Sequence, residues 1–254
     1  MLEIERLTKR YGALTAVQDL SFTVEPGEVL GLLGPNGSGK STTIKVITGL
    51  LEPTRGRVLL DGQDTRADII QYKASLGYVP EEPHLYSYLT GSEYLRLIGQ
   101  LRHIRAAILE DKIERFIELL GLADDQYLPL SSYSKGMRQK ILIAAAVLHN
   151  PRIVVLDEPF SGLDVTTART LKQFVRLLSE AGKLVVFSSH VLEVVEQVCS
   201  RVVILKDGRA VGADSVANLR GLMRLPSLDA VFARIVSEEN TDAASHALVE
   251  AMVS

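Results

Sequence analysis

A glycine-rich stretch, GPNGSGKST at residues 34–42, has residue types and a spacing that suit phosphate chemistry. It fits the pattern G-x-x-x-x-G-K-[ST], in which glycines let the backbone turn tightly so that its N–H groups point at a polyphosphate. Lys40 can reach the β- and γ-phosphates, and the Ser41 hydroxyl can ligate Mg²⁺. We therefore expect a site for ATP or GTP. The expected binding residues are Gly34, Asn36, Gly37, Gly39, Lys40, Ser41 and Thr42.

Two adjacent carboxylates, Asp157 and Glu158, follow the apolar run 153–156. A buried strand places such acids at its carboxyl end, where open α/β sheets bind their ligands. Asp157 suits a contact with Mg²⁺, and Glu158 could polarise a water for attack on a γ-phosphate. The alternative is an ordinary strand end that starts a turn, which the phosphate loop in the same chain disfavours.

The stretch YSKGMRQK at residues 133–140 makes the pattern specific. Together with the loop and the acids, it resembles the ATP-binding cassette (ABC) ATPases over roughly residues 2–212. The family's signature is usually Leu-Ser-Gly-Gly-Gln. This chain keeps its Ser and second Gly as Ser134 and Gly136, and it differs at Tyr133, Lys135 and Met137. The resemblance implies that these two residues complete the ATP pocket of an opposite subunit, because a hydroxyl and an open amide at a helix N-terminus can bind an anion.

The resemblance also implies roles for Tyr11, Asp164 and His190. Tyr11 matches the aromatic residue that stacks on adenine, and Asp164 ends a loop, 161–164, that communicates across the dimer. His190 matches the histidine that touches the γ-phosphate and orients the catalytic groups. Each has a local alternative: strand packing for Tyr11, helix capping for Asp164 and a structural role for His190.

One position departs from the family pattern. The family commonly has Gln after the strand that ends at residue 79, whereas this chain has Glu81, followed by Glu82. A carboxylate there could ligate Mg²⁺ more strongly than an amide, but it adds negative charge near the γ-phosphate. The alternative is that Glu81 points away and serves only its loop.

The elements that must position these residues read as alternating strands and helices, which favours a mainly parallel sheet covered on both faces. The expected strands are 2–5, 20–24, 29–33, 57–60, 76–79, 153–156, 184–187 and 201–205. The expected helices include 41–50, two between 91 and 121, one capped by Ser134, one capped by Asp164, and 191–198. We expect an α/β fold: a P-loop NTPase core with a mainly parallel sheet, an N-terminal antiparallel β subdomain and an inserted α-helical subdomain.

The domain organisation follows from the same pattern. We expect an ABC ATPase domain over residues 1–212, with the helical subdomain inserted at about 84–150. Residues 213–254 are expected to form a short C-terminal helical extension, in which Ser227 could cap a helix.

Composition limits the function classes. The chain has 254 residues, 46% of them apolar, and a net charge of −3, which gives no electrostatic footprint for nucleic acid. Its longest apolar run, 141–148, is far short of the roughly 20 residues that span a bilayer. We therefore expect a soluble chain, with any membrane part supplied by another protein.

The resemblance thus implies an ATP- and Mg²⁺-dependent ATPase subunit of an ABC transporter, peripheral on the cytoplasmic face of the membrane. Its expected partners are a second ATPase subunit, either identical or homologous, and an integral membrane subunit. The segments 77–83, 133–137 and 228–232 resemble the ATPases of ABC-2-type exporters. The alternatives are a soluble cassette ATPase acting on DNA or ribosomes, and a small-molecule kinase.

Overall fold

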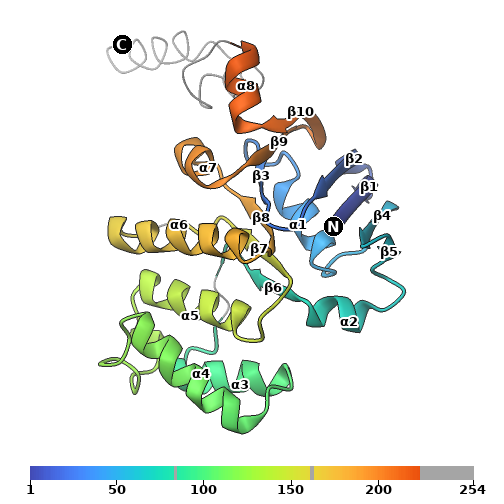
Figure 1. Cartoon of the computed structure of the whole chain (residues 1–254). Coiled ribbons are helices and arrows are strands. Elements are labelled where there is room, and N and C mark those ends of the chain that lie inside the picture. The colour runs from blue at the N-terminus through green and yellow to red at the C-terminus, as the bar shows by residue number, and fades with distance from the viewer. Residues whose placement is uncertain (83–84, 161–162, 224–254) are drawn as a thin grey trace, which may run out of the picture.

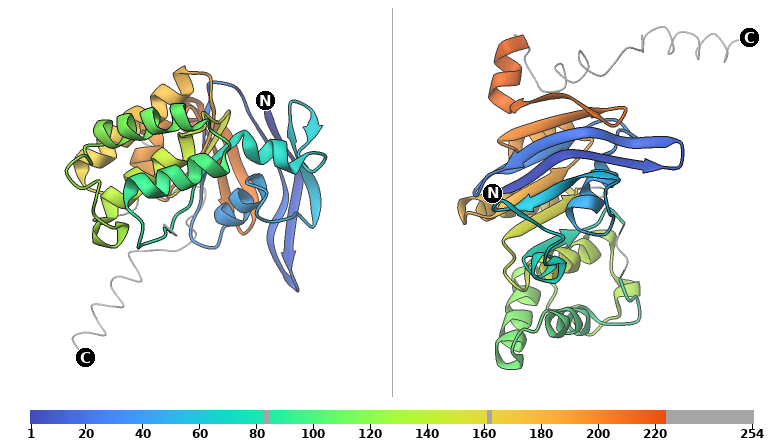
Figure 2. Two further views of the ribbon diagram at one scale, coloured as in Figure 1. Left: turned by 90° about the horizontal axis from the view of Figure 1, so that it is seen from below. Right: turned by 90° about the vertical axis from the view of Figure 1, so that its right-hand side faces the viewer.

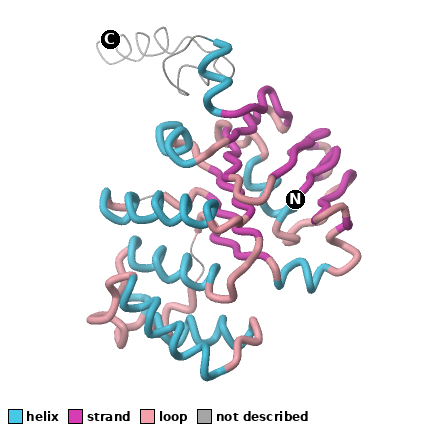
Figure 3. Tube along the Cα trace, viewed as in Figure 1, coloured by secondary structure: helices cyan, strands magenta, loops and turns pink. Residues whose placement is uncertain are grey.

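A computed structural model describes residues 1–82, 85–160 and 163–223, and it contains two sheets (Figure 3). One is antiparallel, with strand order β2-β1-β4-β5. Its strands are β1 (Leu2–Tyr11), β2 (Leu14–Val24), β4 (Arg55–Leu60) and β5 (Gln63–Asp64). The other has the order β10-β9-β3-β8-β7-β6, and every pairing in it is parallel except that of β10 with β9. Its strands are β3 (Val29–Leu33), β6 (Leu76–Val79), β7 (Ile153–Asp157), β8 (Leu184–Ser188), β9 (Arg201–Lys206) and β10 (Arg209–Ser215). The predicted α/β fold is confirmed.

Side-chain caps begin several of the helices. They are α1 (Lys40–Ile47), α2 (Ile69–Ala74), α3 (Gly91–Leu101), α4 (Ala106–Leu119), α5 (Lys135–Val147), α6 (Val165–Glu180), α7 (Leu192–Val198) and α8 (Val216–Met223). The side chains of Ser134 and Asp164 accept hydrogen bonds from the backbone three residues on, so both predicted N-caps are confirmed. Helix α1 is shorter than predicted because Gly49, at φ 67°, ends its last turn.

Helices α5, α6, α7 and α8 pack on one face of the six-stranded sheet, and α1 packs with the antiparallel sheet on the other (Figures 1 and 2). On β7, Val154 and Leu156 pack into the core shared with α5, α6, α7 and α8. Ile153 and Val155 pack instead into the core shared with α1 and the antiparallel sheet. Burial on both faces explains why the central strands are apolar at every position rather than alternating.

Helices α3, α4 and α5 share a third core, which lies at the bottom of Figure 1. Leu95, Ile113 and Ile141 are buried there, one from each helix. These helices lie within the predicted helical subdomain, whose limits at about 84 and 150 stay predictions. The predicted extension 213–254 lies mostly outside the described residues, as does the cap at Ser227.

The strands β1 and β2 are about twice as long as predicted, and α2, β5 and β10 were not predicted. The apolar alternation in β1 is interrupted by irregular pairing with β2 between Ile4 and Arg10. One face of both strands also carries exposed polar residues, such as Arg10 and Gln18. Pairing along the sheet, which a strand's own sequence does not display, extends these strands to Tyr11 and Leu14.

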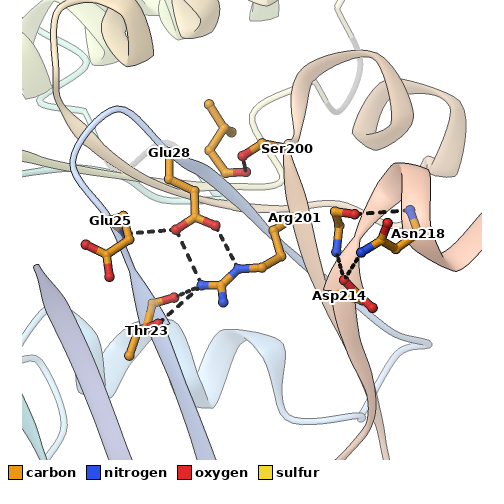
Figure 4. A network of polar contacts seen from close by, with 9 residues as sticks. Thr23, Glu25, Glu28, Ser200, Arg201, Asp214 and Asn218 are labelled. Atoms are coloured by element: carbon orange, nitrogen blue, oxygen red, sulfur yellow. Dashed lines mark hydrogen bonds and ion pairs between the residues drawn. The ribbon is translucent and has the colours of Figure 1, made fainter.

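A network of polar contacts ties the two sheets together at the end of the fold opposite the phosphate loop (Figure 4). The Arg201 guanidinium, at the start of β9, donates to Glu28 Oε1 at 2.7 Å and to the Thr23 carbonyl. The side chains of Arg201 and Glu28 are 33% and 13% exposed, so this ion pair is mostly desolvated. It therefore links β2, β3 and β9 through charge-assisted hydrogen bonds.

Replacing Arg201 by Ala leaves Glu28 and the Thr23 carbonyl without their donor. We expect Arg201→Ala to lower the free energy of unfolding by about 2 kcal/mol in chemical denaturation. The control is Arg57→Ala, which breaks the exposed pair of Arg57 with Glu5 and should cost less than about 1 kcal/mol. Equal losses in the two variants would contradict the special role of the Arg201 network.

Candidate functional site

The carboxyl ends of β3, β8 and β7 meet at one edge of the parallel sheet. Leu32 of β3 and Asp157 of β7 both lie opposite Ser188 of β8 in the strand register. The segments that follow these strands border a pocket of about 550 Å³. Its wall contains the predicted residues Tyr11, Asn36, Gly37, Gly39, Lys40, Ser41, Thr42, Glu81, Glu158 and His190. The structure thus brings together most of the predicted site.

The phosphate loop connects β3 to α1. Gly39, the residue before α1, has φ 103°, which a side chain would strain. Gly34 lies buried behind the pocket wall, where a Cβ would collide with the Ser38 hydroxyl and the Leu205 carbonyl. Glycine at both positions lets the loop close tightly against β9 and then turn directly into the helix.

Lys40 is buried and folds back over the loop. Its Nζ donates to the Gly34 carbonyl at 2.7 Å and to the Pro35 carbonyl at 3.3 Å. The buried Ser38 hydroxyl has no hydrogen-bond partner among the described residues. Three groups therefore suit a bound polyanion: the Lys40 ammonium, the unpaired Ser38 hydroxyl and the N-terminus of α1.

The two acids lie at the end of β7 and are joined through Ser188. The Ser188 hydroxyl donates to Asp157 Oδ1 at 2.6 Å and accepts the backbone N–H of Glu158 at 3.0 Å. Burial raises the pKa of Asp157, and the nearby Glu81 and Glu158 raise it further, whereas the Ser188 bond and Lys40 lower it. A cation beside Asp157 would offset this penalty.

Glu158 has a strained backbone and a fixed side chain. Its φ of 47° lies in the left-handed region, which non-glycine residues rarely adopt. Its Oε2 lies 2.9 Å from His190 Nδ1 and also accepts the backbone N–H of His190 at 3.3 Å. The Glu158 side chain is 8% exposed and that of His190 is 60% exposed, so the pair reaches from the core to the open pocket.

Tyr11 ends β1 at the opposite side of the pocket. Tyr11 is 48% exposed, and the Lys9 ammonium lies over its ring, 5.3 Å from the centroid. An exposed aromatic side chain on the pocket wall suits stacking against a planar base.

Ser134, Gly136 and Asp164 are absent from the pocket wall within the described residues. Ser134 and Asp164 are exposed caps of the neighbouring helices α5 and α6. A Cβ on Gly136 would lie 3.6 Å from Asp164 Oδ2, so the three residues form a separate cluster. Asp164 is engaged as a cap by Thr167, while Ser161 and Gly162 lie outside the described residues.

Comparison with known proteins decides the family. The family model described as ABC transporter matches residues 17–161, more than half of the chain. The chain belongs to the ABC transporter family. It is 37% identical to the ABC transporter ATP-binding protein YhcH of Bacillus subtilis, over 85% of this chain and 70% of the relative.

Two further relatives bear on activity. The bacitracin transport ATP-binding protein BcrA of Enterococcus faecalis is 36% identical, over 86% of this chain and 70% of its own length. A dimeric ATP-binding cassette in a post-hydrolysis state with ADP and Pi superposes with a TM-score of 0.77. It is 26% identical, with 85% of this chain and 98% of that chain covered.

The ABC transporter chain is therefore an ATP-binding subunit with ATPase activity coupled to transport, as predicted. The nucleic-acid alternative finds no support among these relatives. Across the described residues, no helix combines the length and the apolar character that crossing a membrane requires.

Sequence reasoning missed Ser188 as a site residue. A serine at the end of an apolar strand carries no signal by itself, because only the pairing of β7 with β8 places its hydroxyl between Asp157 and the Glu158 amide. Ser188 is buried, and both of its hydrogen bonds orient groups of the site.

We expect Ser188→Ala to lower the ATPase kcat roughly tenfold or more, because the partners that orient functional carboxylates commonly contribute that much. Steady-state phosphate release measures the effect. The matched control is Ser189→Ala, since the Ser189 hydroxyl is also buried but accepts only from the Val191 backbone. If the two variants had the same ATPase kcat, Ser188 would have no functional role in the site.

Proposed function

We propose that this ABC transporter subunit powers export by closing over ATP with a second ATPase chain. The observation that carries the proposal is the division of the site. The pocket wall holds the phosphate loop, Glu158 and His190, whereas the exposed Ser134 and the half-buried Gly136 lie in a separate cluster with Asp164. One chain therefore offers two parts of a site that its own pocket does not bring together.

The division suggests how ATP drives motion. A γ-phosphate in the loop of one chain would complete its contacts with the Ser134 and Gly136 cluster of the other. ATP then favours the closed pair, and hydrolysis weakens that preference. The dimeric cassette that is similar to this chain supports such a pairing. The second chain is either a copy of this one or a homologue.

Each residue of the pocket would have its own role in binding or hydrolysing ATP. Lys40 and the loop amides would hold the β- and γ-phosphates, while Tyr11 would stack on the adenine. Glu158 would accept a proton from the attacking water, because its carboxylate is fixed at the pocket wall. His190 would hold Glu158 in place and contact the γ-phosphate.

The described residues suit Mg²⁺ held by oxygen ligands. No group of three or more His, Cys, Asp and Glu among them is placed to hold a metal ion, and Mg²⁺ commonly binds through one or two carboxylates together with waters and phosphates. Ser41, Asp157 and Glu81 would hold it, and the desolvated Asp157 carboxylate gains most from a cation. Mg²⁺ supplies neutralisation of the phosphate charge.

The direction and the partner rest on the relatives and on the exposed surface. The bacitracin transport relative and the resemblance of segments 77–83, 133–137 and 228–232 to ABC-2-type exporter ATPases favour export. Tyr86 and Tyr88, 54% and 74% exposed, follow the Glu81 loop at the start of the predicted helical subdomain. Exposed aromatics suit contact with another chain. We place an integral membrane subunit here, and the ATPase on the cytoplasmic face of the membrane.

Glu158→Gln keeps the shape of the side chain but removes its basicity. We expect ATP hydrolysis to fall at least about 100-fold, the range that general bases contribute. The uncleaved ATP should trap a closed pair of chains, which size-exclusion chromatography with ATP detects.

The control for Glu158→Gln is Glu180→Gln at the exposed end of α6, which should hydrolyse ATP normally and show no trapped pair. Undiminished turnover in Glu158→Gln would exclude Glu158 as the base. A monomeric Glu158→Gln chain at saturating ATP would contradict the two-chain site.

Glu81→Gln restores the amide that the family commonly has at this position. Because Glu81 lines the pocket and its charge raises the pKa of Asp157, we expect the Mg²⁺ concentration for half-maximal ATPase to rise a few-fold, roughly 1 kcal/mol of lost binding. A Mg²⁺ titration of the ATPase rate measures it.

Glu82→Gln is the matched control, because Glu82 is the exposed neighbour outside the pocket wall. It should leave the Mg²⁺ titration unchanged. An identical titration for Glu81→Gln and the wild-type chain would show that Glu81 serves only its loop.

A further inference from the structure

We propose that the turn Asp207-Gly208, between β9 and β10, sets the separation of the two walls of the nucleotide pocket. Gly208 is then a positioning residue for ATP, although it does not line the pocket. The inference rests on the proposed nucleotide site and adds an element that the site's own motifs do not contain.

The turn is hydrogen-bonded to β2, which borders the pocket on the side of Tyr11, where the nucleoside would lie. The Gly208 carbonyl accepts the backbone N–H of Gln18 at 2.7 Å. The Arg209 guanidinium donates to Gln18 Oε1 at 2.8 and 3.2 Å, so side chains brace the same contact. Two residues before Gln18, Ala16 lines the pocket on the side of Tyr11. Strand β10 also runs beside β2 (Figure 1).

The same turn holds the phosphate side. The backbone N–H of Gly208 donates to the Ser38 carbonyl at 3.2 Å. A Cβ on Gly39 would lie 3.6 Å from the Gly208 Cα and 2.7 Å from the Ala16 carbonyl oxygen. Backbone segments of β2, the phosphate loop and the turn therefore meet here. The turn is hydrogen-bonded to the other two segments.

This junction has no room to adjust. Gly208 is buried, and a Cβ there would lie 2.7 Å from the Ala16 carbonyl oxygen and 3.2 Å from the Val17 Cα. Both neighbours are backbone, which cannot rotate away as a side chain can. Adding one methyl group must therefore displace the turn or β2, and either displacement alters the hydrogen bonds by which the turn connects β2 to the loop. The closest contact is with Ala16 of the pocket wall.

Nucleotide binding would depend on the separation of the two walls, because a bound nucleotide would contact both. Its base and ribose would lie on the side of Tyr11 and Ala16, and its phosphates would lie in the loop 34–42. Inorganic pyrophosphate needs only the loop. A change in the separation of the walls should therefore weaken nucleotide binding and spare pyrophosphate binding, whereas general loosening of the fold would weaken both.

The chain offers a matched control in a second Asp-Gly turn. Asp61 and Gly62 have φ values of 51° and 77°, against 49° and 75° for Asp207 and Gly208. A Cβ on Gly62 meets nothing within 4 Å. Gly62→Ala and Gly208→Ala therefore impose the same local backbone strain, and only Gly208→Ala presses on the pocket wall.

The test measures binding of Mg·ADP and of Mg·pyrophosphate to the full chain by titration calorimetry, since neither ligand is turned over by an ATPase. For Gly208→Ala we expect ADP affinity to fall roughly ten- to a hundredfold, as small misplacements near a site can cause, with pyrophosphate affinity kept. The KM for ATP should rise while kcat is retained. Gly62→Ala should leave all of these values at the wild-type level.

Equal loss of ADP and pyrophosphate affinity in Gly208→Ala, or no loss of either, would overturn the inference. If Gly208→Ala fails to fold, Arg209→Ala decides, because it keeps the turn and removes the brace on Gln18. A smaller but selective loss of ADP affinity supports the inference, and unchanged affinity overturns it. A wild-type chain that binds neither ligand would instead contradict the nucleotide site itself.

Discussion

Parallel pairing in the order β3-β8-β7 is the constraint on which the rest of the structure depends. It sends the carboxyl ends of three buried strands to one edge, so that the phosphate loop, His190 and the acids of β7 meet there although about 120 residues separate Lys40 from Glu158. Apolar side chains on both faces of each strand keep all three strands in the buried middle of the sheet. The chemistry of the site is therefore a consequence of how the core is packed.

The site concentrates features that a merely stable fold would avoid. Lys40 is buried against carbonyl groups, Glu158 has a left-handed backbone, and Asp157 is desolvated beside other carboxylates. The two charged groups become favourable when phosphate and a cation bind, because phosphate supplies the opposite charge for Lys40 and the cation supplies it for Asp157. The surrounding strands and the Ser188 hydrogen bonds hold these groups in position for the ligand.

Much of this could be predicted from the sequence, because the relevant signals are local. The phosphate loop, the Asp157-Glu158 pair and the caps at Ser134 and Asp164 each lie within a few residues of the element that they begin or end. Ser188 and Gly208 could not be found in this way, since their roles come from backbone contacts between segments far apart in the chain. The edge strand β10 could not be predicted for the same reason, because it is defined by its pairing with β9.

In the proposed mechanism, one chain supplies the loop, the base and the histidine to the same γ-phosphate. A crystal structure of the Glu158→Gln chain with Mg·ATP would show whether it does. We expect Lys40 Nζ to leave the Gly34 carbonyl for the phosphates and the γ-phosphate to face residue 158 and His190 of that chain. Phosphates bound elsewhere, or Lys40 still bonded to Gly34 beneath the bound nucleotide, would contradict it.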